Sequence, residues 1–118
     1  MSYRLLIVEP VGQRRERGEV QGREVFQRMV DFGADLKRRG KLRAVESLQS
    51  QDSAARVQRR DGGSQVIDGP FAEAKEMVGG FFLLDNVATR DEALALAAEC
   101  PAAEWATIEV RALGPCYQ

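Results

Sequence analysis

The residues best suited to chemistry stand close together in the second half of this sequence. Asp68 is followed by a glycine and a proline. Proline fixes its own φ and restricts the residue before it, so the Asp68 carboxylate is expected on a rigid turn. Phe71 would form an apolar wall beside it, and Lys75 lies within reach of Asp68 or of an anionic ligand. The pattern is compatible with a carboxylate held at the mouth of a ligand-binding cleft.

The same residues also allow a structural interpretation. Asp68 would cap a short helical turn over residues 71–76 or close its loop through its side chain, and Lys75 would be a solvated charge. Gly79 and Gly80 precede a strongly apolar run. Paired glycines at the start of a strand indicate a β-bulge, or the close approach of a ligand or another backbone. The residue types alone leave these interpretations open.

Acid–base chemistry here must rely on side chains other than histidine, because the sequence contains none. Histidine is the usual general base near neutral pH and the commonest metal ligand. A solvated aspartate is a weak base, so catalysis by Asp68 requires a site that removes it from water. Arg111 or Lys75 would then hold the charge of the substrate. No cofactor or metal site is predicted, since Cys100 and Cys116 lack a metal-binding spacing.

Composition predicts a single domain over residues 1–118. A chain of 118 residues with 44% hydrophobic and 30% charged residues is long enough to bury a core under a polar surface. The net charge of −1 gives no field that would attract nucleic acid. No apolar run is long enough to span a bilayer, and the N-terminus lacks a signal-peptide pattern. We therefore expect a cytoplasmic protein without membrane or direct nucleic-acid partners.

Apolar periodicity predicts a first strand and a first helix. Residues 5–8 and 81–84 are continuous apolar runs, typical of strands buried on both faces, and the second of these strands is expected to extend from Val78 to about Asp85. Helical spacing over about residues 22–39 indicates a helix whose stripe is expected in the core rather than around a ligand. The stripe contains Val25, Phe26, Met29, Val30, Phe32, Gly33 and Leu36. The arginine-rich segment before it, residues 14–19, could bind phosphate or carboxylate groups, but glutamates stand between its arginines, so a solvated loop is expected.

Four further elements follow along the chain. A weaker strand is predicted over residues 42–48, and Asp61-Gly62-Gly63 between two short runs is typical of a β-hairpin. Thr89 and Glu92 match a capping box, so a second helix should begin there. Alternation over residues 105–113 indicates a half-buried final strand. The second helix is expected to turn five side chains inward: Ala93, Leu94, Leu96, Ala97 and Cys100.

Apart from the hairpin inserted before the third core strand, this order is the ferredoxin-like βαββαβ arrangement of the α+β class. The runs at 5–8 and 81–84 would be its central strands. Both helices would cover one face in a two-layer sandwich and leave the other apolar face open. A second copy is the simplest cover, which predicts a homodimer of facing sheets. A monomer with the hairpin folded over its own sheet is the alternative.

The segment 68–76 also resembles a known signature. Asp68-Gly69-Pro70-Phe71-Ala72-Glu73-Ala74-Lys75-Glu76 closely resembles the motif of the DGPFAETKE family, the DGPF branch of the YCII-related proteins. Ala74 stands where that family usually has threonine. Further matching segments are the opening strand at 5–8, the hairpin before the motif, Gly79-Gly80-Phe81, Glu92-Ala93-Leu94, Cys100-Pro101-Ala102 and Ile108-Glu109-Val110-Arg111.

The resemblance implies a dimeric α+β barrel with a small-molecule pocket between the sheet and the inserted loops. In the wider YCII group a histidine–aspartate pair is the suspected active centre, and only Asp68 can be carried over to this chain. DGPF proteins often occur near, or fused to, extracytoplasmic-function sigma factors, which implies a sigma-factor-linked partner. We therefore expect a small-molecule-binding or regulatory dimer. The alternatives are a lyase, isomerase or dehydrochlorinase that uses Asp68, and a purely structural dimer.

Overall fold

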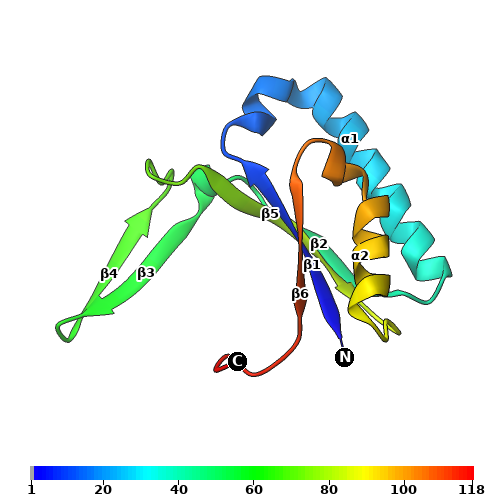
Figure 1. The fold of residues 1–118 in the computed structure, drawn as a ribbon. Coiled ribbons are helices and arrows are strands. Elements are labelled where there is room, and N and C mark those ends of the chain that lie inside the picture. Colours follow the sequence, from blue (N-terminus) through cyan, green and yellow to red (C-terminus); the bar gives the residue numbers. More distant parts are fainter. Residues whose placement is uncertain (1) are drawn as a thin grey trace.

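The computed structural model describes residues 2–118, which form two α-helices and six strands (Figure 1). The elements are β1 (Tyr3–Pro10), α1 (Gln13–Arg38), β2 (Leu42–Ser47), β3 (Ala55–Arg60), β4 (Gly63–Asp68), β5 (Glu76–Leu84), α2 (Arg90–Glu99) and β6 (Thr107–Ala112). Two short 3-10 helices are η1 (Gln51–Ser53) and η2 (Pro101–Glu104). Four strands form one sheet in the order β2-β5-β1-β6, and β3 and β4 pair separately.

The four-stranded sheet is compatible with the predicted ferredoxin-like α+β arrangement. β1 and β5 are its central strands, and all of its pairings are antiparallel. Both helices lie on one side of the sheet (Figure 1). Along β1, Leu5 and Ile7 are buried towards the helices, whereas Leu6 and Val8 are half-buried on the opposite side. We call that opposite side the open face.

The core lies between this sheet and the helices. Its largest fully buried side chains are Leu5, Leu36, Phe82, Leu84 and Cys100. Burial of a large apolar side chain stabilises the fold by about 1.5–3 kcal/mol relative to leaving it exposed. The rings of Phe32 and Phe82 meet edge to face, with their centroids 5.2 Å apart. The C-terminal half of α1 is thereby fixed on the sheet.

The first helix begins earlier than predicted. α1 starts at Gln13, so the arginine-rich segment expected to be a loop is helical. The helix is interrupted at Gly18, whose φ of 79° and ψ of 171° are not helical. The first turns carry few apolar residues, so hydrophobic periodicity gave no signal for them.

Two members of the α1 stripe were wrongly expected in the core. Phe32, Gly33 and Leu36 are buried, but Phe26 and Val30 are 55% and 46% exposed. These two side chains line an open cavity, because the part of α1 that precedes Phe32 is not packed directly on the sheet. Leu94 on α2 is also exposed rather than inward.

The predicted start of the second helix is confirmed at Thr89. Its Oγ1 accepts a hydrogen bond of 3.1 Å from the backbone N–H of Glu92. The Glu92 carboxylate accepts from the backbone N–H of Ala88, at 3.3 Å, rather than from Thr89 as in an ideal capping box. The helix expected over residues 71–76 does not form. A single turn, with Ala74 N donating to Phe71 O at 3.0 Å, precedes β5 instead.

β3 and β4 form an arm that projects away from the four-stranded sheet (Figure 1). Asp61 and Gly62 at its tip have positive φ values of 54° and 78°, as in the tight turns that suit hairpins. All but one of the arm's strand residues are exposed. In residues 2–118, neither helix has an apolar stretch that could cross a bilayer.

Candidate functional site

A cavity of about 1090 Å³ lies between α1 and the sheet strands β1, β2 and β5. Small-molecule sites in proteins typically occupy about 300–1,000 Å³ and are mostly apolar. This cavity lies slightly above that range and has the same mostly apolar lining. Its apolar walls include Val25, Phe26, Met29 and Val30 from α1 and Ile7, Leu42, Val45 and Phe82 from the sheet.

Gly33 shows why the cavity opens where it does. A Cβ atom at Gly33 would meet Phe82 Cε1 at 3.6 Å and Val45 Cγ1 at 3.9 Å, so α1 lies close to the sheet at this point. One to two turns nearer the N-terminus, Phe26 and Val30 have no such close cover and remain exposed. Between this point and its first turn, α1 therefore stands away from the sheet and leaves a space lined by its own apolar stripe.

Glu9 and Arg14 form a two-pronged ion pair in the lining of this cavity. Arg14 Nε donates to Glu9 Oε2 at 3.1 Å, and Arg14 Nη2 donates to Oε1 at 2.6 Å. Glu9 is 6% exposed, and the Arg14 side chain is 34% exposed. Arg14 also donates to the carbonyl oxygens of Leu48 at 2.7 Å and Gly79 at 3.3 Å. One guanidinium thus joins the start of α1 to β1, β5 and the end of β2.

The two glycines of β5 are required by this packing. A register shift in the β1–β5 pairing leaves Gly79 as the extra residue of a bulge, since Ile7 pairs with Gly80 and Val8 with Val78. A Cβ atom at Gly79 would fall on the Glu9 carboxylate. At Gly80, a Cβ atom would lie 2.8 Å from the carbonyl oxygen of Glu46 on β2. Both glycines also line the cavity.

Trp105 lines the same cavity between two arginines. The guanidinium carbons of Arg17 and Arg28 lie 5.5 Å and 5.4 Å from the centroid of its ring, within cation–π range. Gln13 Nε2 donates to the Trp105 carbonyl at 2.7 Å. Arg28 also pairs with Glu104, and its hydrogen bond is the main cause that lowers the pKa of that carboxyl group. Trp105 is the only tryptophan in the sequence, so its fluorescence reports on this cavity.

Most charges in the cavity lining are already paired. Glu9 binds Arg14, Arg15 binds Asp52 and Arg23 binds Glu19. In the described residues, Arg17 and Lys37 are the lining cations without a carboxylate partner. No group of three metal-ligating side chains gathers within residues 2–118. Glu46 also contributes to the lining, but its pairing with Phe81 places its carboxylate on the open face. The cavity therefore offers apolar contact and spare positive charge.

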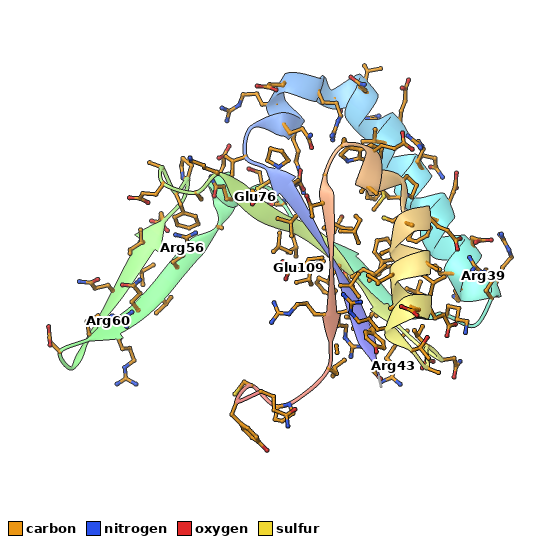
Figure 2. The ribbon with its side chains drawn as sticks, in the orientation of Figure 1. Arg39, Arg43, Arg56, Arg60, Glu76 and Glu109 are labelled. Atoms are coloured by element: carbon orange, nitrogen blue, oxygen red, sulfur yellow. The ribbon has the colours of Figure 1, made fainter. Side chains whose placement is uncertain are left out.

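A second cavity, of about 580 Å³, lies at the base of the arm. Phe71 is buried in its lining, and the Arg56 guanidinium carbon stacks 3.8 Å from the centroid of the Phe71 ring. Gln51 and Val78 also line it. Figure 2 shows Arg56 between the arm and the start of β5, where Glu76 is labelled. Phe71 thus holds the arm's base against the sheet through an arginine.

The other predicted site residues lie apart from both cavities. Asp68 is exposed at the end of β4 and pairs in the arm with Ala55. Lys75 is exposed just before β5. Arg111 is exposed on β6, where its Nη1 donates to Glu109 Oε2 at 3.0 Å. The structure thus brings Gly79 and Gly80 to the first cavity and Phe71 to the second, and it does not bring the six candidates together.

The sequence does not identify Glu9 and Trp105 as site residues, and it places Arg14 in a cluster expected to be a solvated loop. A signal for Glu9 was present: it continues the inward phase of Tyr3, Leu5 and Ile7, so a carboxylate occupies an inward position of a buried strand. A buried carboxylate requires a partner. The spacing alone cannot show that Arg14 supplies it, because the first turns of α1 lack the apolar periodicity that would indicate a helix.

Comparison with known proteins places most of the chain within one family profile. The profile of the YCII-related domain matches residues 8–116. An uncharacterized protein of Rhizobium meliloti (strain 1021) is 43% identical over 76 residues, which are 63% of this chain. The matched region spans 60% of the length of that relative.

Proposed function

Because the chain belongs to the YCII-related family, we propose that it is a dimeric small-molecule-binding protein. The ligand occupies the cavity between α1 and the sheet. One observation carries this proposal: a cavity of about 1090 Å³ whose lining includes Phe26 and Val30, two apolar side chains that the fold leaves exposed. Apolar side chains exposed in a concave site are characteristic of ligand binding.

The lining indicates an organic anion as the ligand class. The walls from α1 and the sheet offer contact to an apolar or aromatic body. Arg17 and Lys37 provide positive charge that no carboxylate in residues 2–118 neutralises. The fixed pair of Glu9 and Arg14 holds the surrounding strands and leaves no charge free for the ligand.

Dimerisation is the second part of the proposal. Leu6, Val8, Phe81 and Leu83 form an apolar centre on the open face that the chain's own helices do not cover. A second copy on this face, as in a dimeric α+β barrel of the DGPF branch, would remove them from water. The sigma-factor-linked partner stays a prediction from the family resemblance. Catalysis through Asp68 gains no support, because Asp68 lines neither cavity.

The cavity can be tested with 8-anilinonaphthalene-1-sulfonate, which combines an apolar aromatic body with one negative charge. We expect saturable binding with energy transfer from Trp105. Val30→Gln should weaken binding about fivefold, which corresponds to about 1 kcal/mol of lost apolar contact. The matched control is Val20→Gln, on the same helix but outside the cavity lining.

Charge and apolar contact can be separated in the same assay. Arg17→Gln should weaken binding of the sulfonate but leave binding of neutral N-phenyl-1-naphthylamine unchanged. Equal effects of Val30→Gln and Val20→Gln, or binding that does not saturate, would overturn the assignment of the ligand to this cavity.

A further inference from the structure

The chain has more surface than its size requires. It exposes 8154 Å², whereas a compact monomer of 13.1 kDa is expected to expose about 6,400 Å². Its radius of gyration is 16.1 Å, against about 13.5 Å for a compact domain of this length. The arm and the open face both contribute to this excess. Both lack a cover in the isolated chain (Figure 1).

One corner of the open face is basic. Arg4 continues the phase of Leu6 and Val8 on β1, and Arg111 lies directly opposite it on β6. Two like charges opposite each other across a strand pair are destabilising. Arg111 is paired with Glu109, but within residues 2–118 Arg4 has no carboxylate partner. We call Arg4 and Arg111 the basic corner.

The opposite half of the same face is acidic. Glu46 lies on the edge strand β2, level with Phe81 on β5. Glu76 is at the far end of β5, opposite Pro10 at the end of β1. In the described part of the chain neither carboxylate has an ion-pair partner. Glu46 and Glu76 form what we call the acidic corner, and it lies diagonally across the apolar centre from the basic corner.

This diagonal arrangement is self-complementary. Consider two copies with facing sheets, related by a two-fold axis that lies in the plane between them. If the axis runs along the diagonal that does not join the two corners, the rotation places the basic corner of each copy on the acidic corner of the other. The same rotation crosses the strands of the two sheets at about a right angle, which is one of the two common geometries of sheet packing. An axis parallel to the strands would instead keep the basic ends of both copies together.

We propose that a second copy of this chain covers the open face with its strands crossed. Arg4 then pairs with Glu46 of the partner subunit, and Arg111 lies beside Glu76 of the partner subunit. Two-fold symmetry makes each of these contacts twice. This proposal rests on the dimer of the proposed function and adds its axis and its charge pairing.

The buried area indicates that the arm takes part. Four strands about 4.8 Å apart and about 20 Å long cover about 400 Å² per copy. Twice that area is below the roughly 1,200–2,000 Å² of stable interfaces. The arm lies between β2 and β5 in the chain, next to the acidic corner. It therefore overhangs the partner's basic corner and adds the missing area, and the partner stabilises a two-stranded arm that is marginal alone.

A charge swap tests the pairing directly. Sedimentation velocity across a concentration series gives the dimer dissociation constant of each variant. Arg4→Glu alone and Glu46→Arg alone should each raise it about tenfold or more, since like charges then face each other. The double variant Arg4→Glu/Glu46→Arg should return to within about threefold of the unmodified protein, because the pairing is reversed but intact.

The matched controls are Arg90→Glu and Glu24→Arg, two exposed helix positions that form no ion pair within residues 2–118, and neither should change the constant. If the double variant loses as much dimerisation free energy as the two single variants together, the crossed arrangement is overturned, whereas the dimer of the proposed function still stands. A monomer at all concentrations would overturn both. Neither result affects the fluorescence assay, which tests the cavity separately.

Discussion

A Cβ atom on Gly79 would overlap Oε1 of Glu9, far inside any real non-bonded contact. The carboxylate cannot simply turn away, because Arg14 holds both of its oxygens. The bulge in β5, the end of β1 and the start of α1 are therefore one packed unit beside the cavity.

Gly79→Ala should destabilise the protein by about 1–3 kcal/mol, because the Glu9 carboxylate must leave its hydrogen bonds while staying largely buried. Urea unfolding measures the change. Gly22→Ala is the matched control, since its Cβ would meet nothing within 4 Å. It should stabilise the protein by about 0.5–1 kcal/mol, as expected for a helix-interior glycine. Equal unfolding free energies for the two variants would contradict the close packing at Gly79.

Arg14→Met should destabilise the protein by about 2 kcal/mol. Loss of one partner of a fully buried pair costs about 3–5 kcal/mol, and the partial exposure of Arg14 reduces that figure. Adding Glu9→Gln should recover part of the loss, because the remaining side chain is then uncharged. For the exposed pair of Arg15 and Asp52, Arg15→Met should cost less than about 1 kcal/mol. If the changes in unfolding free energy caused by Arg14→Met and Glu9→Gln simply add in the double variant, the coupling of the two side chains is contradicted.

The strand order could be predicted from the sequence because period and burial are local signals. The apolar runs at 5–8 and 81–84 became the central strands β1 and β5, and the alternation at 107–112 became the edge strand β6. The cavity could not be predicted in this way. Phe26 and Val30 flank the stripe of Phe32 and Leu36, about 80–120° around the helix from Leu36, and their sequence pattern does not show whether another element packs against them.

The candidate site shows the same limit. The rigid turn after Asp68 and the close approach at Gly79 and Gly80 follow from the local chemistry of proline and glycine. Whether Asp68 reaches a cavity depends on how the whole arm is oriented, which no short segment encodes. Glu9 and Arg14 come together because α1 begins twelve residues before its apolar stripe does, in turns that carry no stripe of apolar side chains.

Stability should fall with rising pH between about 9 and 11 because of Cys100. Burial is the main cause that raises the pKa of this thiol from 9.0 to about 11. The unfolded chain then loses the thiol proton at lower pH than the folded chain. The contribution of Cys100 to the free energy of unfolding is therefore complete below pH 9.0 and disappears as pH approaches 11. The effect is on the order of 2 kcal/mol.

Urea unfolding at pH 8 and pH 10.5 measures this loss. Cys100→Ala should flatten the pH dependence, although it lowers stability overall by leaving a cavity in the core. Cys116→Ala is the matched control, because that free thiol is exposed. A pH dependence unchanged by Cys100→Ala would contradict the assignment.

The arm should be less exposed in solution than it is in the isolated chain. Val57 and Val66 are cross-strand partners, and they are 67% and 66% exposed. Without a partner copy, replacing either valine by serine should change little, because an exposed side chain makes few contacts. If the second copy covers the arm, each substitution removes apolar burial twice in the symmetric dimer and should raise the dimer dissociation constant about tenfold. Val20→Ser, at an exposed position on α1, should leave the constant unchanged.

Hydrogen exchange gives an independent reading, since the arm's amides should exchange more slowly at concentrations above the dissociation constant than below it. Exchange in the arm that does not depend on concentration, together with serine variants that dimerise normally, would show that the partner leaves the arm uncovered.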